Sequence, residues 1–251
     1  MPETKIAVFA SGRGSNFKSI LDHVRLGVLR NCEVRLLVTN EASAGALSIA
    51  REYSVPHAYM DHRGVSLYEY EQKVLERLRE MEIDLLVMAG WNWMVGRTLS
   101  SSYEWRIMAI HPSLHPAFMG PLLSPEEVYA QVLRSGVKVT GCTVYYVSAN
   151  VDMGPIVLQS AVEIPSRVYD LYLRDARSAV ESLREIVSKR EHITLPKAIQ
   201  LHVDGMIELR RLDGGYHAIV RSDERWDEDW EGRQAIYKRF AGLVDQERDP
   251  V

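Results

Sequence analysis

The stretch Ile6-Ala7-Val8-Phe9-Ala10-Ser11-Gly12-Arg13-Gly14-Ser15-Asn16 joins a short apolar run to a glycine-rich turn, and a helical pattern follows from about Phe17. A continuous apolar run of this length, followed by a glycine turn, indicates a buried β-strand. Glycines let a backbone approach an anion closely, and the N–H groups at the start of a helix point at it. The stretch therefore predicts a phosphate or carboxylate site, with a tight turn that binds nothing as the alternative. The dinucleotide fingerprint is a poor match because its third glycine is missing.

Outward from this turn, short apolar runs alternate with longer helical patterns along the chain. Such alternation is typical of a parallel sheet covered by helices. We therefore predict an α/β, Rossmann-like fold with a mostly parallel twisted sheet and helices on both faces. The further strands are expected at 34–38, 57–59, 84–88, 107–111, 139–147 and 156–164, and helices at 126–135, at 168 to about 190 and after the capping box Ser66-Leu67-Tyr68-Glu69.

Length, charge and cysteine content limit the class of protein. The 251 residues suffice for one large α/β domain or two small ones. Because 30 Lys and Arg face 34 Asp and Glu, a broadly basic nucleic-acid binder is excluded. No apolar run approaches the roughly 18 residues of a membrane span, and no signal peptide is visible. With only two cysteines, we expect a cytoplasmic protein.

The chain changes in character after Lys197. Two strand-like segments, 206–211 and 216–221, flank Asp213-Gly214-Gly215 and predict a hairpin. An acidic segment with Trp226 and Trp230 follows. We therefore predict a main domain over residues 1–210 and an acidic, Trp-containing C-terminal extension over 211–251.

Two loops at the ends of predicted strands carry candidate catalytic groups. His111, in Ala109-Ile110-His111-Pro112-Ser113-Leu114-His115-Pro116, can serve as a general acid or base near neutral pH. Asp152, in Asn150-Val151-Asp152-Met153-Gly154-Pro155, could orient that histidine and stabilise its charged form. The alternatives are a structural histidine and an Asx-turn aspartate.

A third loop, Met88-Ala89-Gly90-Trp91-Asn92-Trp93-Met94-Val95-Gly96, follows another predicted strand directly. Aromatic side chains beside backbone polar groups suit a flat heteroaromatic ligand. A loop that only packs on the core is the alternative.

In this order and spacing, the four elements resemble a folate-dependent formyltransferase of the phosphoribosylglycinamide formyltransferase family over roughly Lys5 to Arg210. The resemblance implies the formyltransferase fold and transfer of a formyl group from 10-formyltetrahydrofolate to an amine, with phosphoribosylglycinamide of purine biosynthesis as the first candidate. It implies catalytic His111 and Asp152; folate-binding Met88, Trp91, Trp93, Met94, Val95, Val147, Ser148 and Asn150; substrate-binding Gly14, Ser15, Asn16, Asn92, Ile110 and Pro112; and no metal.

The mechanism implied by the resemblance is a direct transfer. The substrate amine would attack the formyl carbon, and the resulting tetrahedral oxyanion would collapse to the new amide. His111 would stabilise that oxyanion and move protons, while Asp152 would set the charge and orientation of the histidine.

This chain departs from the family pattern at several substrate-side positions. Ala109 stands where the family has an asparagine whose amide donates to the oxyanion, and losing such a donor typically costs about 10²–10³ in rate. Counting back without gaps from Ala89 places Leu67 at the family's phosphate-contacting arginine. The long predicted helix has Ala176-Arg177 where family members carry a Glu-His pair. We predict that Asn92 or His115 supplies a donor near the missing amide.

Three interpretations remain open. The first is formyl transfer to phosphoribosylglycinamide with a weakened or rearranged active site, and the second is the same chemistry on another amine. The changed substrate-side positions favour the second, or a relaxed form of the first. The third is a non-catalytic or weakened folate- or phosphate-binding protein, which Ala109 favours and the intact His111 and Asp152 oppose. A dehydrogenase is weaker still. We expect a small, phosphorylated amine as partner, no nucleic acid and no membrane, and we leave a homodimer open.

Overall fold

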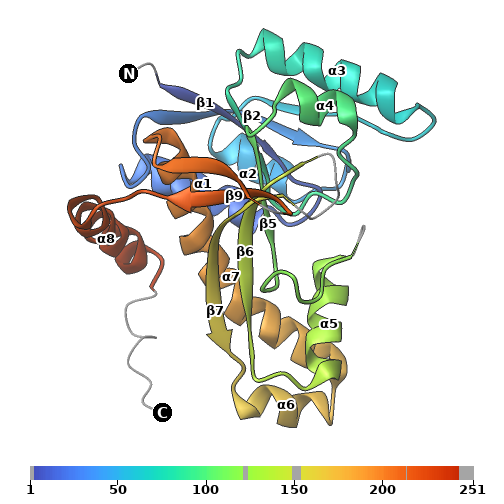
Figure 1. Ribbon diagram of the computed structural model, residues 1–251. Helices are drawn as coiled ribbons and strands as arrows, with labels where there is room; N and C mark the ends of the chain where they lie inside the picture. The colour runs from blue at the N-terminus through green and yellow to red at the C-terminus, as the bar shows by residue number, and fades with distance from the viewer. Residues whose placement is uncertain (1–2, 121–123, 149–153, 213, 243–251) are drawn as a thin grey trace.

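The computed structural model describes residues 3–120, 124–148, 154–212 and 214–242. A seven-stranded sheet with the order β3-β2-β1-β4-β5-β6-β7 forms its centre (Figure 1). The strands are β1 (Thr4–Phe9), β2 (Cys32–Thr39), β3 (His57–Tyr59), β4 (Leu85–Met88), β5 (Ile107–His111), β6 (Val139–Tyr146) and β7 (Ile156–Glu163). The helices are α1 (Ser15–Arg25), α2 (Ala46–Glu52), α3 (Leu67–Glu80), α4 (Arg97–Ser102), α5 (Pro125–Ser135), α6 (Ser166–Tyr172), α7 (Ala176–Val203) and α8 (Glu224–Phe240).

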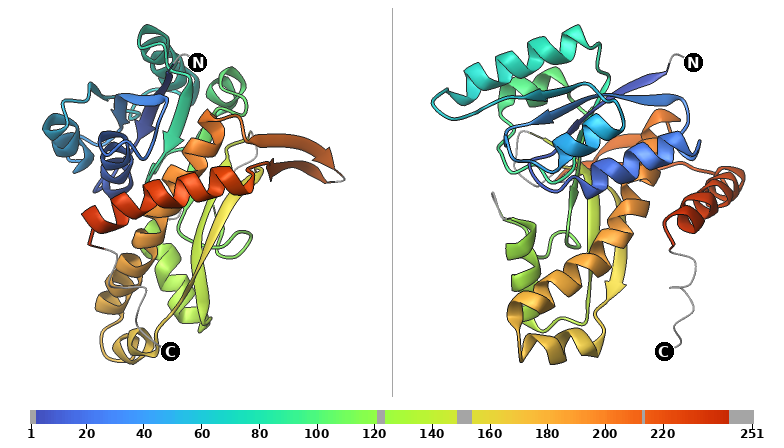
Figure 2. Two further views of the ribbon diagram at one scale, coloured as in Figure 1. Left: turned by 90° about the vertical axis from the view of Figure 1, so that its left-hand side faces the viewer. Right: turned by 180° about the vertical axis from the view of Figure 1, so that it is seen from behind.

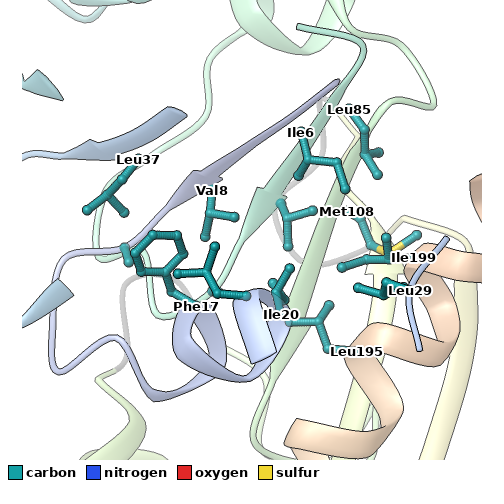
Figure 3. Close-up of a cluster of buried hydrophobic side chains, with 14 of the residues drawn as sticks. Ile6, Val8, Phe17, Ile20, Leu29, Leu37, Leu85, Met108, Leu195 and Ile199 are labelled. Carbon is teal, nitrogen blue, oxygen red and sulfur yellow. The ribbon is translucent and has the colours of Figure 1, made fainter. Parts of the chain in front are cut away.

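The sheet is mostly parallel and covered on both faces, which confirms the predicted fold class. Strands β1 to β5 pair in parallel, and β6 pairs antiparallel with both β5 and β7. Because side chains alternate along a strand, Ile6 and Val8 of β1 pack towards α1, α2 and α7, whereas Ala7 and Phe9 pack towards α3 and α4. Figure 3 shows the first of these clusters, in which Phe17 lies beneath Val8.

The helix expected from residue 168 to about 190 is instead two helices. The chain leaves α6 at Leu173, and Asp175 begins α7 by accepting hydrogen bonds from the N–H groups of Arg177 and Ser178 at 3.0 and 3.2 Å. An aspartate at an N-cap satisfies donors that a continuous helix would satisfy internally. The apolar periodicity continues across the break, which is why it concealed this boundary.

Helix α7 also continues past its expected end, through Pro196 to Val203. A proline inside a helix removes the hydrogen bond to the carbonyl four residues earlier, which here belongs to His192. The Ser19 hydroxyl of α1 donates to that carbonyl at 2.9 Å. The proline is therefore tolerated because a neighbouring helix satisfies the freed group.

The C-terminal residues form a hairpin and a helix that contact the main domain. Strands β8 (Ile207–Leu212) and β9 (Gly215–Val220) pair antiparallel, as the sequence predicted. Helix α8 crosses α7 in Figure 2. Its Trp230 is fully buried against Val28, and the Trp226 indole N–H donates to Asp204 at 2.7 Å.

No helix within the described ranges combines the length and apolar character needed to cross a membrane.

Candidate active site

The glycine-rich turn leads into α1 as predicted. Gly14 has φ = 80°, in the left-handed region that favours glycine. A Cβ at this position would lie 2.8 Å from the Cα of Ala46, so the close approach of α2 also requires glycine. In the described part of the chain no side chain caps α1, and its first N–H groups stay available for a ligand at Ser15 and Asn16.

Asn16 connects this turn to the long helix α7. Its Nδ2 donates to Oε2 of Glu191 at 2.9 Å, and its Oδ1 is buried with no hydrogen-bond partner among the described residues. Burial raises the pKa of the Glu191 carboxyl, an effect that the Asn16 hydrogen bond opposes. An unsatisfied oxygen beside a helix N-terminus is where a donor group of a bound substrate would be stabilised.

The position expected for a substrate-side carboxylate lies away from the cavity. Ala176, which stands where the family pattern has a glutamate, is exposed at the start of α7. Glu191, further along the same helix, lines the cavity.

The loop Met88–Gly96 is fixed to β1 through Ser11. The Ser11 hydroxyl donates to Asn40 Oδ1 at 2.7 Å and accepts from the Asn92 backbone N–H at 3.1 Å. The Asn40 amide donates in turn to Asn92 Oδ1 at 2.8 Å. Asn92 is thus tied into a closed hydrogen-bonded ring through its side-chain oxygen, and it holds the loop at the end of the sheet.

A buried carboxylate fixes the other end of this loop. Glu71 of α3 is 2% exposed, accepts from the Gly96 N–H, and accepts from the Leu99 N–H at 3.2 Å. It therefore caps the start of α4, because a carboxylate is favourable at a helix N-terminus.

Replacing Glu71 with alanine is expected to leave both N–H groups without their acceptor and to lower the free energy of unfolding by about 1–3 kcal/mol. Urea denaturation measures this loss. Glu76→Ala on the exposed face of the same helix is the matched control and should change stability by less than about 0.5 kcal/mol. Equal effects of the two substitutions would contradict the capping role.

His111 lies at the carboxyl end of β5 in a defined hydrogen-bonding state. Its Nδ1 lies 2.9 Å from the Ser113 hydroxyl, which itself donates to the Ala117 carbonyl at 2.7 Å. A hydroxyl has one proton to donate, so Nδ1 must donate to Ser113. The lone pair of the neutral ring then resides on Nε2, the nitrogen suited to act as a base.

The His115 ring lies against His111, with the two ring centroids 4.9 Å apart. Its other neighbour is Tyr145, at 4.9 Å between centroids. Ala109, the residue at the family's asparagine position, is 6% exposed and pairs directly with Tyr145 across β5 and β6. The rings of His115 and Tyr145 therefore lie beside Ala109 and His111, and both rings carry groups that can donate.

One cavity of about 640 Å³ brings these elements together. Most of the predicted site residues line it, namely Gly14, Ser15, Asn16, Met88, Trp91, Asn92, Trp93, Met94, Val95, Ile110, His111, Pro112, Val147 and Ser148. The predicted Asn150 and Asp152 lie outside the described residues. Among the described residues, no cluster of three or more His, Cys, Asp or Glu could hold a metal ion.

Helix α7 contributes a polar stripe to the cavity that was not predicted from the sequence. Arg184, Ser188 and Glu191 all line it, and their spacing of four and three residues places them on one helix face. Arg13 also lines the cavity. Glu181 joins the two arginines, because its carboxylate binds Arg184 and lies 3.2 Å from Arg13. The i, i+4, i+7 polar spacing was the signal in the sequence.

Leu67 lies outside this cavity lining, as the first residue of α3. Its Cδ2 would lie 2.9 Å from a Cβ at Gly96, so the leucine packs on the loop that Glu71 caps. Arg13 and Arg184 therefore supply positive charge to the cavity from elements other than α3.

Comparisons with known proteins agree with this geometry. The formyl transferase family model matches residues 4–199. Phosphoribosylglycinamide formyltransferase of Bacillus subtilis (strain 168) is 34% identical over 200 residues, which cover 78% of this chain and 93% of that protein.

Two solved structures extend the similarity to the backbone. Glycinamide ribonucleotide transformylase 1 from Symbiobacterium toebii matches with a TM-score of 0.76 and 33% identity, covering 88% of this chain and 95% of that one. Phosphoribosylglycinamide formyltransferase from Bacillus halodurans matches with a TM-score of 0.69 and 36% identity, covering 78% and 94%. The chain therefore belongs to the formyl transferase family, among the relatives of phosphoribosylglycinamide formyltransferase.

Proposed function

We propose that this chain transfers a formyl group from 10-formyltetrahydrofolate to the primary amine of a phosphorylated substrate, with phosphoribosylglycinamide as the first candidate. The observation that carries the proposal is that the glycine-rich turn, the aromatic loop and His111 line a single cavity. A phosphate site, a site for a flat ring and a base are thereby within reach of one another.

The residues of the cavity suit a folate. Trp91, Trp93, Met94 and Val95 offer apolar and aromatic surface, which suits a pterin ring. The Trp93 Nε1 is buried and has no hydrogen-bond partner among the described residues, so a polar edge of a bound ring would satisfy it. 10-Formyltetrahydrofolate would supply the formyl group as co-substrate. We assign the ring to this loop together with Val147 and Ser148.

The phosphate of the acceptor would bind at the start of α1. The N–H groups of Ser15 and Asn16 favour an anion there. Arg13 and Arg184 add positive charge and can exchange part of their contact with Glu181 for the phosphate. Glu191 would hold the ammonium or hydroxyl groups of the same substrate. Because Glu191 provides a carboxylate on the substrate side of the cavity, the loss of a carboxylate at Ala176 no longer favours a different amine.

His111 would receive the proton of the attacking amine on Nε2. Its Nδ1 hydrogen bond to Ser113 keeps that lone pair on Nε2. As the amine nitrogen binds the formyl carbon, negative charge grows on the formyl oxygen, and the imidazolium formed at His111 stabilises it. Asp152, proposed from the family pattern, would stabilise that imidazolium.

The test is to mix the protein with 10-formyltetrahydrofolate and phosphoribosylglycinamide and to follow tetrahydrofolate formation. We expect turnover that depends on the amine and that falls at least about tenfold with the dephosphorylated substrate, because the charge-assisted phosphate contacts are lost. Folate binding without turnover on any amine would instead favour the non-catalytic alternative suggested by Ala109.

A further inference from the structure

We propose that the Tyr145 hydroxyl donates a hydrogen bond to the formyl oxygen in the reaction, in place of the side-chain amide that Ala109 lacks. The inference rests on the proposed formyl transfer and names a catalytic residue within the same cavity. Its starting observation is the direct pairing of Ala109 with Tyr145 across the antiparallel strands β5 and β6.

Direct pairing places the two side chains on one face of the sheet. Cβ atoms of directly opposite residues lie about 4.5–5.5 Å apart, so a longer side chain at one position can reach over a short one at the other. Both residues belong to the core cluster on the α3 side, and both line the cavity. A phenol carries a proton to donate, whereas alanine has none.

The Tyr145 ring lies in a cluster of rings that includes His111. His111 lies two residues along β5 from Ala109 and therefore on the same face. The Tyr145 ring contacts the His115 ring, which contacts the His111 ring. The tyrosine thus belongs to the ring cluster next to the base.

The backbone beneath this cluster is held firmly. The Thr143 hydroxyl accepts from the His115 N–H at 3.0 Å and donates to the Ser113 carbonyl at 2.7 Å. The Gln159 amide also donates to the His115 carbonyl at 3.1 Å. A fixed donor costs little reorganisation when charge develops, which is the condition for stabilising an oxyanion.

The chemical step needs no further reactant. The amine nitrogen forms a bond to the formyl carbon, and the π electron pair of the carbonyl moves to oxygen, where the Tyr145 O–H donates without losing its proton. When the carbonyl re-forms, the bond from carbon to N10 of the folate breaks and its electron pair stays on N10. N10 then takes up a proton, balancing the one that the amine gave to His111.

The test is a double-mutant cycle of Tyr145→Phe and Ala109→Asn, with kcat measured at saturating substrates. We expect Tyr145→Phe alone to lower kcat by about 10- to 100-fold, the range for one hydrogen bond to a charged group. In the Ala109→Asn background, adding Tyr145→Phe should lower kcat by less than about threefold relative to Ala109→Asn alone, because the restored amide then donates to the same oxygen.

Tyr146→Phe is the matched control. This tyrosine is the next residue on β6, belongs to the core cluster of the opposite face, and its hydroxyl lies 2.6 Å from His202 Nδ1. Loss of the Tyr146 hydroxyl should leave kcat within about twofold of the value for the unsubstituted protein. Folate affinity, followed by tryptophan fluorescence, should be unchanged in Tyr145→Phe, because the ring that lines the cavity is retained.

The outcomes separate the two proposals. Turnover with equal losses from Tyr145→Phe in both backgrounds would overturn the role of Tyr145 and leave the formyl transfer standing. A loss that appears in folate affinity rather than kcat would also overturn it. If no variant transfers a formyl group to an amine, both proposals fail together.

Discussion

Replacing His111 with alanine is expected to lower kcat/KM for formyl transfer by about 10²- to 10⁴-fold, the contribution of a positioned acid–base group. In the proposed mechanism, the substitution removes the nitrogen that receives the amine proton and the positive charge that then faces the oxyanion. Single-turnover measurements with 10-formyltetrahydrofolate and phosphoribosylglycinamide check the chemical step directly.

Two further variants make the test of His111 specific. His217→Ala removes an exposed histidine from β9 and should leave the rate unchanged. Ser113→Ala removes the acceptor of the His111 Nδ1–H while keeping the ring. It should give an intermediate loss, since the preference for the Nε2 lone pair is lost. A His111→Ala protein as fast as the His217→Ala control would exclude the acid–base role.

Replacing Trp230 with alanine is expected to lower the free energy of unfolding by about 3–5 kcal/mol, the usual range for a fully buried tryptophan. The Trp230 ring is 0% exposed, packs against Val28, and stacks on Trp226 with an interplanar angle of 6°. The loss should be visible as a lower midpoint of urea unfolding.

Ile236→Ala is the matched control for Trp230→Ala, because Ile236 lies on the same helix and is 50% exposed. It should cost less than about 0.5 kcal/mol. If the two substitutions have equal effects, α8 is not part of the cooperatively folded structure.

Contacts between α8 and α1 connect the packing of α8 to the active site. Gln234 Oε1 lies 3.2 Å from His23 Nε2, and the Tyr237 ring lies 3.7 Å from the His23 ring. Burial lowers the His23 pKa to about 4. Because α1 also carries Asn16 at its other end, we expect Trp230→Ala to raise KM for the phosphorylated substrate as well. We therefore propose that the described part of the predicted extension, residues 211–212 and 214–242, is integrated with the main domain.

Much of the sheet could be predicted from local pattern alone. Runs such as Leu36–Val38 and Leu85–Met88 are apolar throughout, and only a strand buried on both faces tolerates such a run. The capping box at Ser66 and Glu69 is likewise a local hydrogen-bonding device, and it forms as predicted. Strand ends also located the loops of the site, because carboxyl ends of parallel strands meet at one edge.

Features that depend on contacts between distant segments could not be predicted from local sequence pattern. The end of α7 depends on Ser19 satisfying the carbonyl freed by Pro196, and the two lie far apart in sequence. The role of Glu191 depends on Asn16, which lies 175 residues away. Such partners cannot be identified from positions along the sequence.

The sequence by itself determined the fold class, the glycine turn, the aromatic loop and His111, because each follows from side-chain periodicity or backbone chemistry within a few residues. Only the tertiary structure decided what surrounds Ala109. The rings of His115 and Tyr145, the carboxylate of Glu191 and the arginines at the cavity wall come from different elements. The tertiary structure also placed the acidic C-terminal segment, because its buried Trp230 packs against Val28 just after α1. Strand register and helix packing fix those positions, and both arise from burying apolar surface across the whole chain.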